Sequence, residues 1–265
     1  MLNRFGDLYA LLLGWPALAR LHKGLLYLSS RALGLHNYSS SAISGESWLV
    51  RHRLAGKARP IVFDIGANNG DWLGEVRRIS AQACIHAFEP QRALAEQILA
   101  KHRDVTVNVA AVGAEAGVLE LFDYADHPGS QHASLVAGVI DTVHGGAVRS
   151  TQVRVVPLDA YCLEKGVDRI DLLKIDVEGF ELQVLRGAQR MLSEGRIGAI
   201  QFEFTHLNVV GRVFVDDFFR LLGPTYTLHR LLPHGLMPIS CQNHWSNEQF
   251  VYQNLFALNS QYNHA

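Results

Sequence analysis

The chain has little cysteine, little net charge and no long uninterrupted apolar run. Its 265 residues include three cysteines that are far apart and form no CxxC pair. This spacing indicates neither a disulfide framework nor a structural zinc site. The formal net charge of −1 gives no reason to expect a nucleic-acid partner. Because the cysteines indicate no disulfide framework, a reducing, cytoplasmic setting is the expected one.

The N-terminal segment is apolar but does not read as a membrane-spanning helix. Residues 8–34 are rich in leucine, yet Arg20, Lys23 and Arg31 interrupt them, whereas a spanning helix needs about 20 mostly apolar residues. The leucines fall near helical spacing, which predicts one or two amphipathic helices docked on the domain. Weak association with a membrane surface is the alternative, because the segment's charges are mostly basic.

Strand-like runs alternate with helical patterns from residue 60 onward. The runs cover residues 61–65, 84–88, 105–109, 172–176 and 198–204, and the helical patterns cover 71–80, 91–101, 180–193 and 215–222. Strands separated by helix-length segments imply crossover connections. The predicted fold class is therefore α/β, with a doubly wound, mostly parallel sheet.

Two regions depart from this alternation. Residues 110–160 contain two strand-like runs around a long loop rich in Gly and His, which predicts an inserted loop and strand segment. Residues 226–232 and 254–259 are predicted to be two late strands joined by a polar loop. We divide the chain into an N-terminal helical extension, residues 1–50, and one α/β domain, residues 51–265.

A glycine-bounded turn follows the first strand, in the stretch IVFDIGANNGDW. Asn68 stands where the dinucleotide fingerprint has the glycine that lets the backbone approach a pyrophosphate. No GK[ST] follows, so a Walker-type phosphate loop is excluded as well. The turn from Gly66 to Gly70 remains suited to a small anion such as a carboxylate at a helix N-terminus. Asp64 adds an acceptor for an amino group beside it.

Glu89 ends the second strand in the stretch HAFEP, about 20 residues further on, where an acid accepts hydrogen bonds from ribose hydroxyls. A ligand with an amino acid end, a ribose and no phosphate is S-adenosylmethionine, which we predict as the cofactor. Two other functions share this pattern. One is an NAD-dependent oxidoreductase, and the other is a non-catalytic Rossmann-like binding protein.

Seven stretches together resemble the FkbM-type methyltransferases. They are VFDIGANNGDW, AFEP, NVAAVG, SLV, VPLD, LLKIDVEGFELQVLRGA and IQFEF, which follow one another within residues 60–205. The resemblance implies a class I methyltransferase fold with a seven-stranded sheet, S-adenosylmethionine as methyl donor, and O-methylation of a hydroxyl on a sugar, glycan or secondary metabolite.

The resemblance also implies where the cofactor lies. Asp64, Gly66 and Asn68, with Gly70 closing the turn, would surround the methionine moiety, and Glu89 would bind the ribose. Asn108 and Ala110, at the end of the third strand, would lie near the adenine.

Four protonatable side chains follow the fourth and fifth strands and are the candidates for catalysis. Asp176 and Glu178 lie in KIDVEG, and Glu203 and His206 lie in FEFTH. Histidine has the pKa best matched to taking a proton at neutral pH, so His206 is the predicted general base, with Asp176 or Glu203 orienting it. In the alternatives, Asp176 is a buried hydrogen-bonded acid, Glu178 caps a helix, and His206 is an ordinary loop histidine.

Other polar residues receive structural interpretations. Lys174 lies inside an apolar strand and is expected to point outward or to pair with an acid. His127, His132 and His144 fit no metal-ligand spacing, so we interpret them as solvated loop histidines. No metal requirement is predicted, because no cluster of acids supplies the several oxygen ligands that a hard cation needs.

Overall fold

The structure is a computed structural model that describes residues 2–126, 129–130 and 132–262. The strands are β1 (Ile61–Ile65), β2 (Cys84–Phe88), β3 (Thr106–Asn108), β4 (Ala111–Val112), β5 (Gly117–Tyr124), β6 (Val148–Val156), β7 (Leu172–Ile175), β8 (Ala199–Phe204), β9 (Tyr226–Leu232), β10 (Gly235–Pro238) and β11 (Gln253–Asn259). The helices are α1 (Leu2–Leu13), η1 (Pro16–Leu18), α2 (Ala19–Ala32), α3 (Ser41–Ser44), α4 (Glu46–Leu54), α5 (Asp71–Ile79), α6 (Arg92–Lys101), η2 (Val139–His144), α7 (Leu158–Lys165), α8 (Glu181–Arg186), α9 (Gln189–Ser193), α10 (Leu207–Gly211), α11 (Val215–Leu222), η3 (Gly223–Thr225) and α12 (His244–Asn247).

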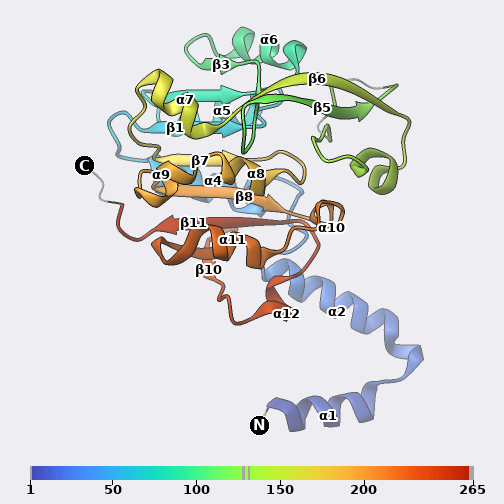
Figure 1. Ribbon diagram of the computed structural model, residues 1–265. Coiled ribbons are helices and arrows are strands. Elements are labelled where there is room, and N and C mark those ends of the chain that lie inside the picture. The colour runs from blue at the N-terminus through green and yellow to red at the C-terminus, as the bar shows by residue number, and fades with distance from the viewer. Residues whose placement is uncertain (1, 127–128, 131, 263–265) are drawn as a thin grey trace.

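Within the described residues, eight strands form the main sheet in the order β10-β9-β11-β8-β7-β1-β2-β3 (Figure 1). The strands from β8 to β3 are parallel, and β11 runs antiparallel to both of its neighbours. The α/β, mostly parallel prediction is confirmed. The sheet has one strand more than the predicted seven, because β10 pairs with β9 as a short hairpin in the stretch expected to be a loop.

Helices cover both faces of this sheet, and each face has its own apolar core. Side chains alternate along a strand, so Val62 of β1 packs in one cluster and Phe63 and Ile65 pack in the other. Helices α4, α5 and α6 contribute to the first cluster, and α7, α8, α9 and α11 contribute to the second. This double covering leaves the carboxyl ends of the parallel strands as the edge where polar side chains gather.

The predicted insertion is a small separate sheet. Strands β4, β6 and β5 form it in that order, and β5 and β6 pair antiparallel along their whole length. The long connection between β5 and β6 carries η2, and in it Ser134 pairs with Phe122 of β5 as an isolated bridge. The Ser134 hydroxyl also donates to the carbonyl oxygen of Glu178, which follows β7 of the main sheet, at 2.7 Å. The insertion therefore brings the loop around Ser134 toward the carboxyl edge of the main sheet.

The helix predicted over residues 180–193 is two helices. Helix α8 ends at Arg186, and α9 begins at Gln189. The carboxylate of Asp159 accepts hydrogen bonds from the backbone N–H groups of Arg190 and Met191, at 2.7 and 3.0 Å. Because these N–H groups are bonded by a side chain from another helix, α9 starts anew instead of continuing α8.

The N-terminal helices differ from the docked arrangement that we predicted. Every side chain from Arg4 to Leu13 is exposed, and α2 has no buried residue. Figure 1 shows α1 and α2 extending away from the domain as an arm. No helix among the described residues is long and apolar enough to cross a membrane.

Helix α4 behaves differently from this arm. Leu49, Val50 and Leu54 are fully buried in the cluster that also contains Val62. The division of the chain at residue 50 stays a prediction, and α4 spans that position.

Candidate functional site

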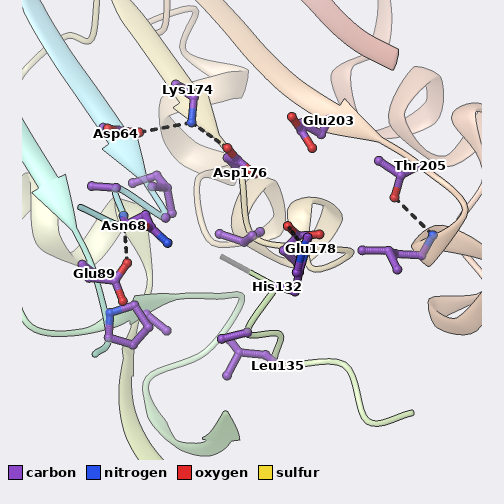
Figure 2. Close-up of a pocket in the computed structure, with 18 of the residues that line it drawn as sticks. Asp64, Asn68, Glu89, His132, Leu135, Lys174, Asp176, Glu178, Glu203 and Thr205 are labelled. Carbon is purple, nitrogen blue, oxygen red and sulfur yellow. Dashed lines mark hydrogen bonds and ion pairs between the residues drawn. The ribbon is translucent and has the colours of Figure 1, made fainter. Parts of the chain in front are cut away.

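A pocket of about 940 Å³ opens at the carboxyl edge of the main sheet. Ligands of open α/β sheets bind at this edge, beside the point where the strand order reverses. The pocket is lined by the turn after β1, the ends of β2, β7 and β8, the insertion, and two segments near the chain ends. Figure 2 shows the acidic side chains converging on it from several elements.

The turn after β1 holds the acid at the end of β2. The backbone N–H of Asn68 donates to the Glu89 carboxylate at 2.9 Å, and that of Gln91 donates to its other oxygen at 2.8 Å (Figure 2). Gly66 has a φ of +82°, and a Cβ there would collide with the carbonyl oxygen of Asp176. Only glycine therefore allows β1 and β7 to close this corner of the pocket.

A buried lysine lies between two acids of the pocket. Lys174 Nζ is 2.9 Å from Asp176 Oδ2 and 3.6 Å from Asp64 Oδ1 (Figure 2). Burial lowers the lysine pKa, but the two carboxylates outweigh burial and raise it, so the ammonium stays charged. The prediction that Lys174 either points outward or pairs with an acid is resolved in favour of pairing.

Asp64 is the least satisfied of these acids. It is fully buried, and neither of its carboxylate oxygens takes part in a hydrogen bond within the described part of the chain. Burial raises its pKa to about 6, although Lys174 acts in the opposite direction. Lys174 is 3.6 Å away, and a buried carboxylate with so few donors is destabilising unless a ligand supplies more, so Asp64 marks a place where donors from a ligand are expected.

Glu178 lies in a strained loop directly after β7. Its φ is +52°, in the left-handed region that non-glycine residues seldom adopt. Ser134 Oγ donates to the Glu178 carbonyl oxygen at 2.7 Å, and the buried Glu181 carboxylate accepts from the N–H of Gly179 at 3.1 Å. Glu181, not Glu178, therefore satisfies the backbone before α8, so the capping alternative for Glu178 is wrong.

The Glu178 side chain faces a histidine from the insertion. His132 Nδ1 lies 3.6 Å from Glu178 Oε1, and Figure 2 shows the two side chains together. The carboxylate raises the pKa of His132, while burial raises the pKa of Glu178. His132 is exposed in a loop, as expected, with its side chain 49% accessible, but it also lines the pocket and faces Glu178, which the sequence did not indicate. His127 lies outside the described residues, and His144 lies in η2.

The end of β8 contributes Glu203 and His206. Burial, together with the neighbouring acids Asp176 and Glu178, raises the pKa of Glu203. The hydroxyl of Tyr252 donates to the Glu203 carboxylate. His206 lines the pocket at the start of α10 and is exposed.

Most of the residues predicted from the sequence line this pocket together. They are Asp64, Gly66, Asn68, Glu89, Ala110, Asp176, Glu178, Glu203 and His206. Gly70 and Asn108 are not among the lining residues. Gly70 precedes α5 with a φ of +80°, and the Asn108 amide donates to the Ala87 carbonyl and to the Tyr161 hydroxyl, at 3.1 and 3.2 Å.

Sequence reasoning missed one wall of the pocket. His36 and Tyr38 reach it from the segment after α2, and Phe250 and Tyr252 reach it from the segment before β11. These two segments are joined, because the His36 N–H donates to the Tyr252 carbonyl at 2.8 Å. Neither segment carries a pattern of its own, so nothing in the sequence signals that they meet.

The pocket is strongly acidic. Six carboxylate residues and one lysine line it, namely Asp64, Asp71, Glu89, Asp176, Glu178, Glu203 and Lys174. Burial also raises the pKa of Glu89, to about 7. A pocket with this charge favours a cationic ligand and disfavours a phosphate. Among the residues that the structure describes, no three His, Cys, Asp or Glu side chains are grouped to hold a metal ion. The absence of a metal requirement stays a prediction.

Comparison with known proteins identifies one family. The methyltransferase FkbM domain matches residues 64–225. Methyltransferase sdnD of Sordaria araneosa is 31% identical over 49% of this chain and 61% of its own length. The 31-O-demethyl-FK506 methyltransferase FkbM of Streptomyces tacrolimicus is 28% identical over 53% and 64%. The chain thus spans less than two thirds of the length of these relatives.

The solved structures that this chain matches are more distant in sequence. An O-methyltransferase from Bacillus cereus, in complex with SAH, is 12% identical, with a TM-score of 0.41 over 96% of both chains. An rRNA methylase from Streptococcus thermophilus is 12% identical, with a TM-score of 0.45 over 84% of this chain and 99% of its own. At 12% identity, neither protein indicates the substrate of this chain.

Proposed function

Because the chain belongs to the FkbM methyltransferase family, which matches more than half of its length, we propose that it methylates a hydroxyl oxygen of a small molecule, sugar or glycan. Its cofactor is S-adenosylmethionine. The nicotinamide-dependent alternative is set aside by the family. We place the enzyme in a reducing, cytoplasmic setting that suits its free cysteines Cys84, Cys162 and Cys241, without a nucleic-acid partner.

The observation that carries this proposal is the acidic pocket. A sulfonium is cationic, and a cation in the pocket favours the ionised form of the six acids, which outnumber the one lysine of the lining. The unsatisfied oxygens of Asp64 fit the ammonium group of the methionine moiety. Gly66, Asn68, Glu89 and Ala110 line the same pocket as Asp64. In this proposal Gly66 and Asn68 would hold the methionine moiety with Asp64, Glu89 would bind the ribose, and Ala110 would lie near the adenine. Gly70 and Asn108 do not line the pocket. In this proposal Gly70 holds the turn before α5, and Asn108 holds the end of β3 against β2.

The chemistry needs little from the protein. S-adenosylmethionine supplies an already activated methyl group, so the difficult chemistry belongs to the cofactor. The chain's own residues hold the acceptor hydroxyl in line, which is worth roughly 7–11 kcal/mol of the barrier. They must also take the proton that the hydroxyl loses. Asp176, Glu178, Glu203, His132 and His206 line the pocket, and we place the acceptor beside them.

We assign the general base to His132, with Glu178 orienting it. The sequence favoured His206, oriented by Asp176 or Glu203. Those two acids have other partners, since Asp176 accepts from Lys174 and Glu203 accepts from Tyr252. The Glu178 carboxylate lies 3.6 Å from His132 Nδ1, and a carboxylate there favours the imidazole as proton acceptor. His206 then lines the acceptor side and provides the matched comparison.

The cofactor assignment is tested by Glu89→Ala. The variant removes charge-assisted hydrogen bonds worth about 1.5–3 kcal/mol each, so S-adenosylmethionine affinity should fall at least about tenfold in calorimetry. The control is Glu96→Ala on the exposed side of α6, which should bind as the parent does. An unchanged affinity in folded Glu89→Ala would remove Glu89 from the site.

The base assignment is tested with labelled cofactor once acceptor profiling of cell extracts has supplied a substrate. His132→Asn should lower the turnover rate about 10²-fold or more with cofactor affinity unchanged, and His206→Asn should have a smaller effect. The reverse order would return the role to His206. If Asp176→Asn alone is inactive, the proton goes to Asp176. Cofactor binding without any methyl transfer would favour a non-catalytic binding protein.

A further inference from the structure

The arm formed by α1, η1 and α2 exposes large apolar side chains that no other described part of the chain covers. On α1 these include Phe5, Leu8 and Leu12, which are 51–68% exposed. On α2, Leu21, Leu25 and Leu28 are 49–65% exposed. In each helix the three residues are spaced three or four apart and so share one face. A contiguous exposed apolar surface of this kind marks an interaction site.

Hydrogen bonds hold the two helices of the arm together. The Tyr9 hydroxyl and His22 Nδ1 are 3.0 Å apart, and His22 Nε2 is 3.0 Å from the Leu13 carbonyl oxygen. Trp15 lies at the corner between the helices, 65% exposed, and its ring N–H donates to the Leu12 carbonyl at 3.1 Å. Exposed Trp and Tyr beside leucines are typical of segments that lie at a membrane–water interface.

The arm is basic, which favours an anionic partner. Residues 1–40 contain four basic residues and one acidic residue, whereas the whole chain carries slightly more acid than base. On α2, Arg20 and Lys23 lie away from the stripe of Leu21, Leu25 and Leu28, as the helical spacing places them. A helix with an apolar face and a basic face is the kind that lies in the headgroup region of anionic lipids. A second copy of the arm would instead bring like charges together.

The base of the arm is joined to the wall of the pocket. Leu35 pairs with Gln253, and the His36 N–H donates to the Tyr252 carbonyl at 2.8 Å. His36 and Tyr38 line the pocket. Three residues of chain span at most about 10 Å, so the end of α2 lies close to the pocket mouth.

We propose that the arm, residues 2–33, binds the surface of an anionic lipid bilayer through the apolar faces of α1 and α2 and Trp15. The pocket mouth is then held beside that surface. This role does not depend on the reaction, because it rests on the exposed residues and charges of the arm alone.

The test is flotation of the full chain with two kinds of vesicle, phosphatidylcholine alone and phosphatidylcholine mixed with phosphatidylglycerol. The chain should float with the anionic vesicles, and less so as salt rises. The double variant Leu25→Glu with Leu28→Glu should lose flotation. Arg20→Glu with Lys23→Glu should weaken binding at least about fivefold for each basic residue removed.

Matched variants elsewhere separate the arm from general surface effects. Leu163→Glu with Val118→Glu changes two residues that are 70% and 61% exposed on the domain, and Arg103→Glu with Arg154→Glu changes two exposed basic residues. Both should float as the parent does. The proposal is overturned if the parent does not float, if neutral vesicles bind equally well, or if the leucine variants float unchanged. A dimer that only the arm variants dissociate, without flotation, would assign the surface to a second copy.

Discussion

The pocket and the arm depart from the usual pattern of a globular protein in opposite ways. The pocket buries charge, with Lys174 between Asp64 and Asp176, whereas the arm exposes leucines, Trp15 and Tyr9. Buried charges and exposed apolar patches are both unfavourable without a partner. Each region therefore indicates a partner through the groups that it leaves unsatisfied. The acids of the pocket indicate a cationic cofactor, and the exposed apolar and basic residues of the arm indicate an anionic lipid surface.

The largest expected effect lies on the pocket side of this comparison. Lys174→Met leaves the buried Asp64 and the partly exposed Asp176 without their cation, and breaking a buried pair costs about 3–5 kcal/mol. Urea denaturation at neutral pH measures the loss. Lys101→Met, at the exposed pair with Asp71, should cost less than about 1 kcal/mol. Equal costs for the two variants would mean that the pocket lysine does not hold its acids.

A second prediction compares apolar residues of the domain and the arm. Leu185→Ala in α8, where Leu185 is fully buried, should cost about 2–5 kcal/mol of unfolding free energy. Leu25→Ala and Leu28→Ala in α2 should change it by no more than about 0.5 kcal/mol. The same urea titration serves all three variants. A large loss for the α2 variants would show that the arm packs against the domain in solution.

A third prediction uses the pH dependence of the cofactor-free protein. The pKa of Glu89 is about 7, above its ordinary value, because the carboxyl is buried. The folded state therefore binds a proton that the unfolded state releases between about pH 4.5 and 7. Stability should thus be higher near pH 5 than near pH 8, and Glu89→Gln should reduce this difference by on the order of 2 kcal/mol.

Thermal denaturation across this pH range measures that effect. Glu181, whose pKa burial raises to about 8, should leave part of the dependence in place in the Glu89→Gln variant. The exposed Glu96→Gln should behave as the parent does. A parent protein whose stability rises from pH 5 to pH 8 would contradict the buried, protonated state of these acids.

Local patterns in the sequence predicted the parallel part of the sheet well. The ranges expected for β1 and β2 agree with the structure residue for residue, and those for β7 and β8 agree within one residue. Apolar runs between helical patterns identify such strands because both sides of a covered sheet are buried. The helix over 180–193 was predicted as one, because its break depends on Asp159, which lies in another helix.

The sequence predicted those residues of the candidate site that lie at the ends of parallel strands. Asp64, Glu89, Asp176 and Glu203 all line the pocket, since the carboxyl ends of parallel strands meet at one edge. The neighbour of His132 was missed, because the sequence does not reveal that the insertion folds back far enough to place this exposed histidine beside Glu178.

The sequence by itself determined the family, the cofactor and the positions of the parallel strands along the chain, because these depend on short motifs and on the alternation of strand and helix patterns. Tertiary structure alone decided which acids Lys174 pairs with, that His132 faces Glu178, and that His36 meets Tyr252. It also decided that the leucines of α1 and α2 stay uncovered. The physical reason is that the spacing of apolar residues in the sequence determines which face of a helix is apolar. What lies against that face depends on how distant segments of the chain pack together.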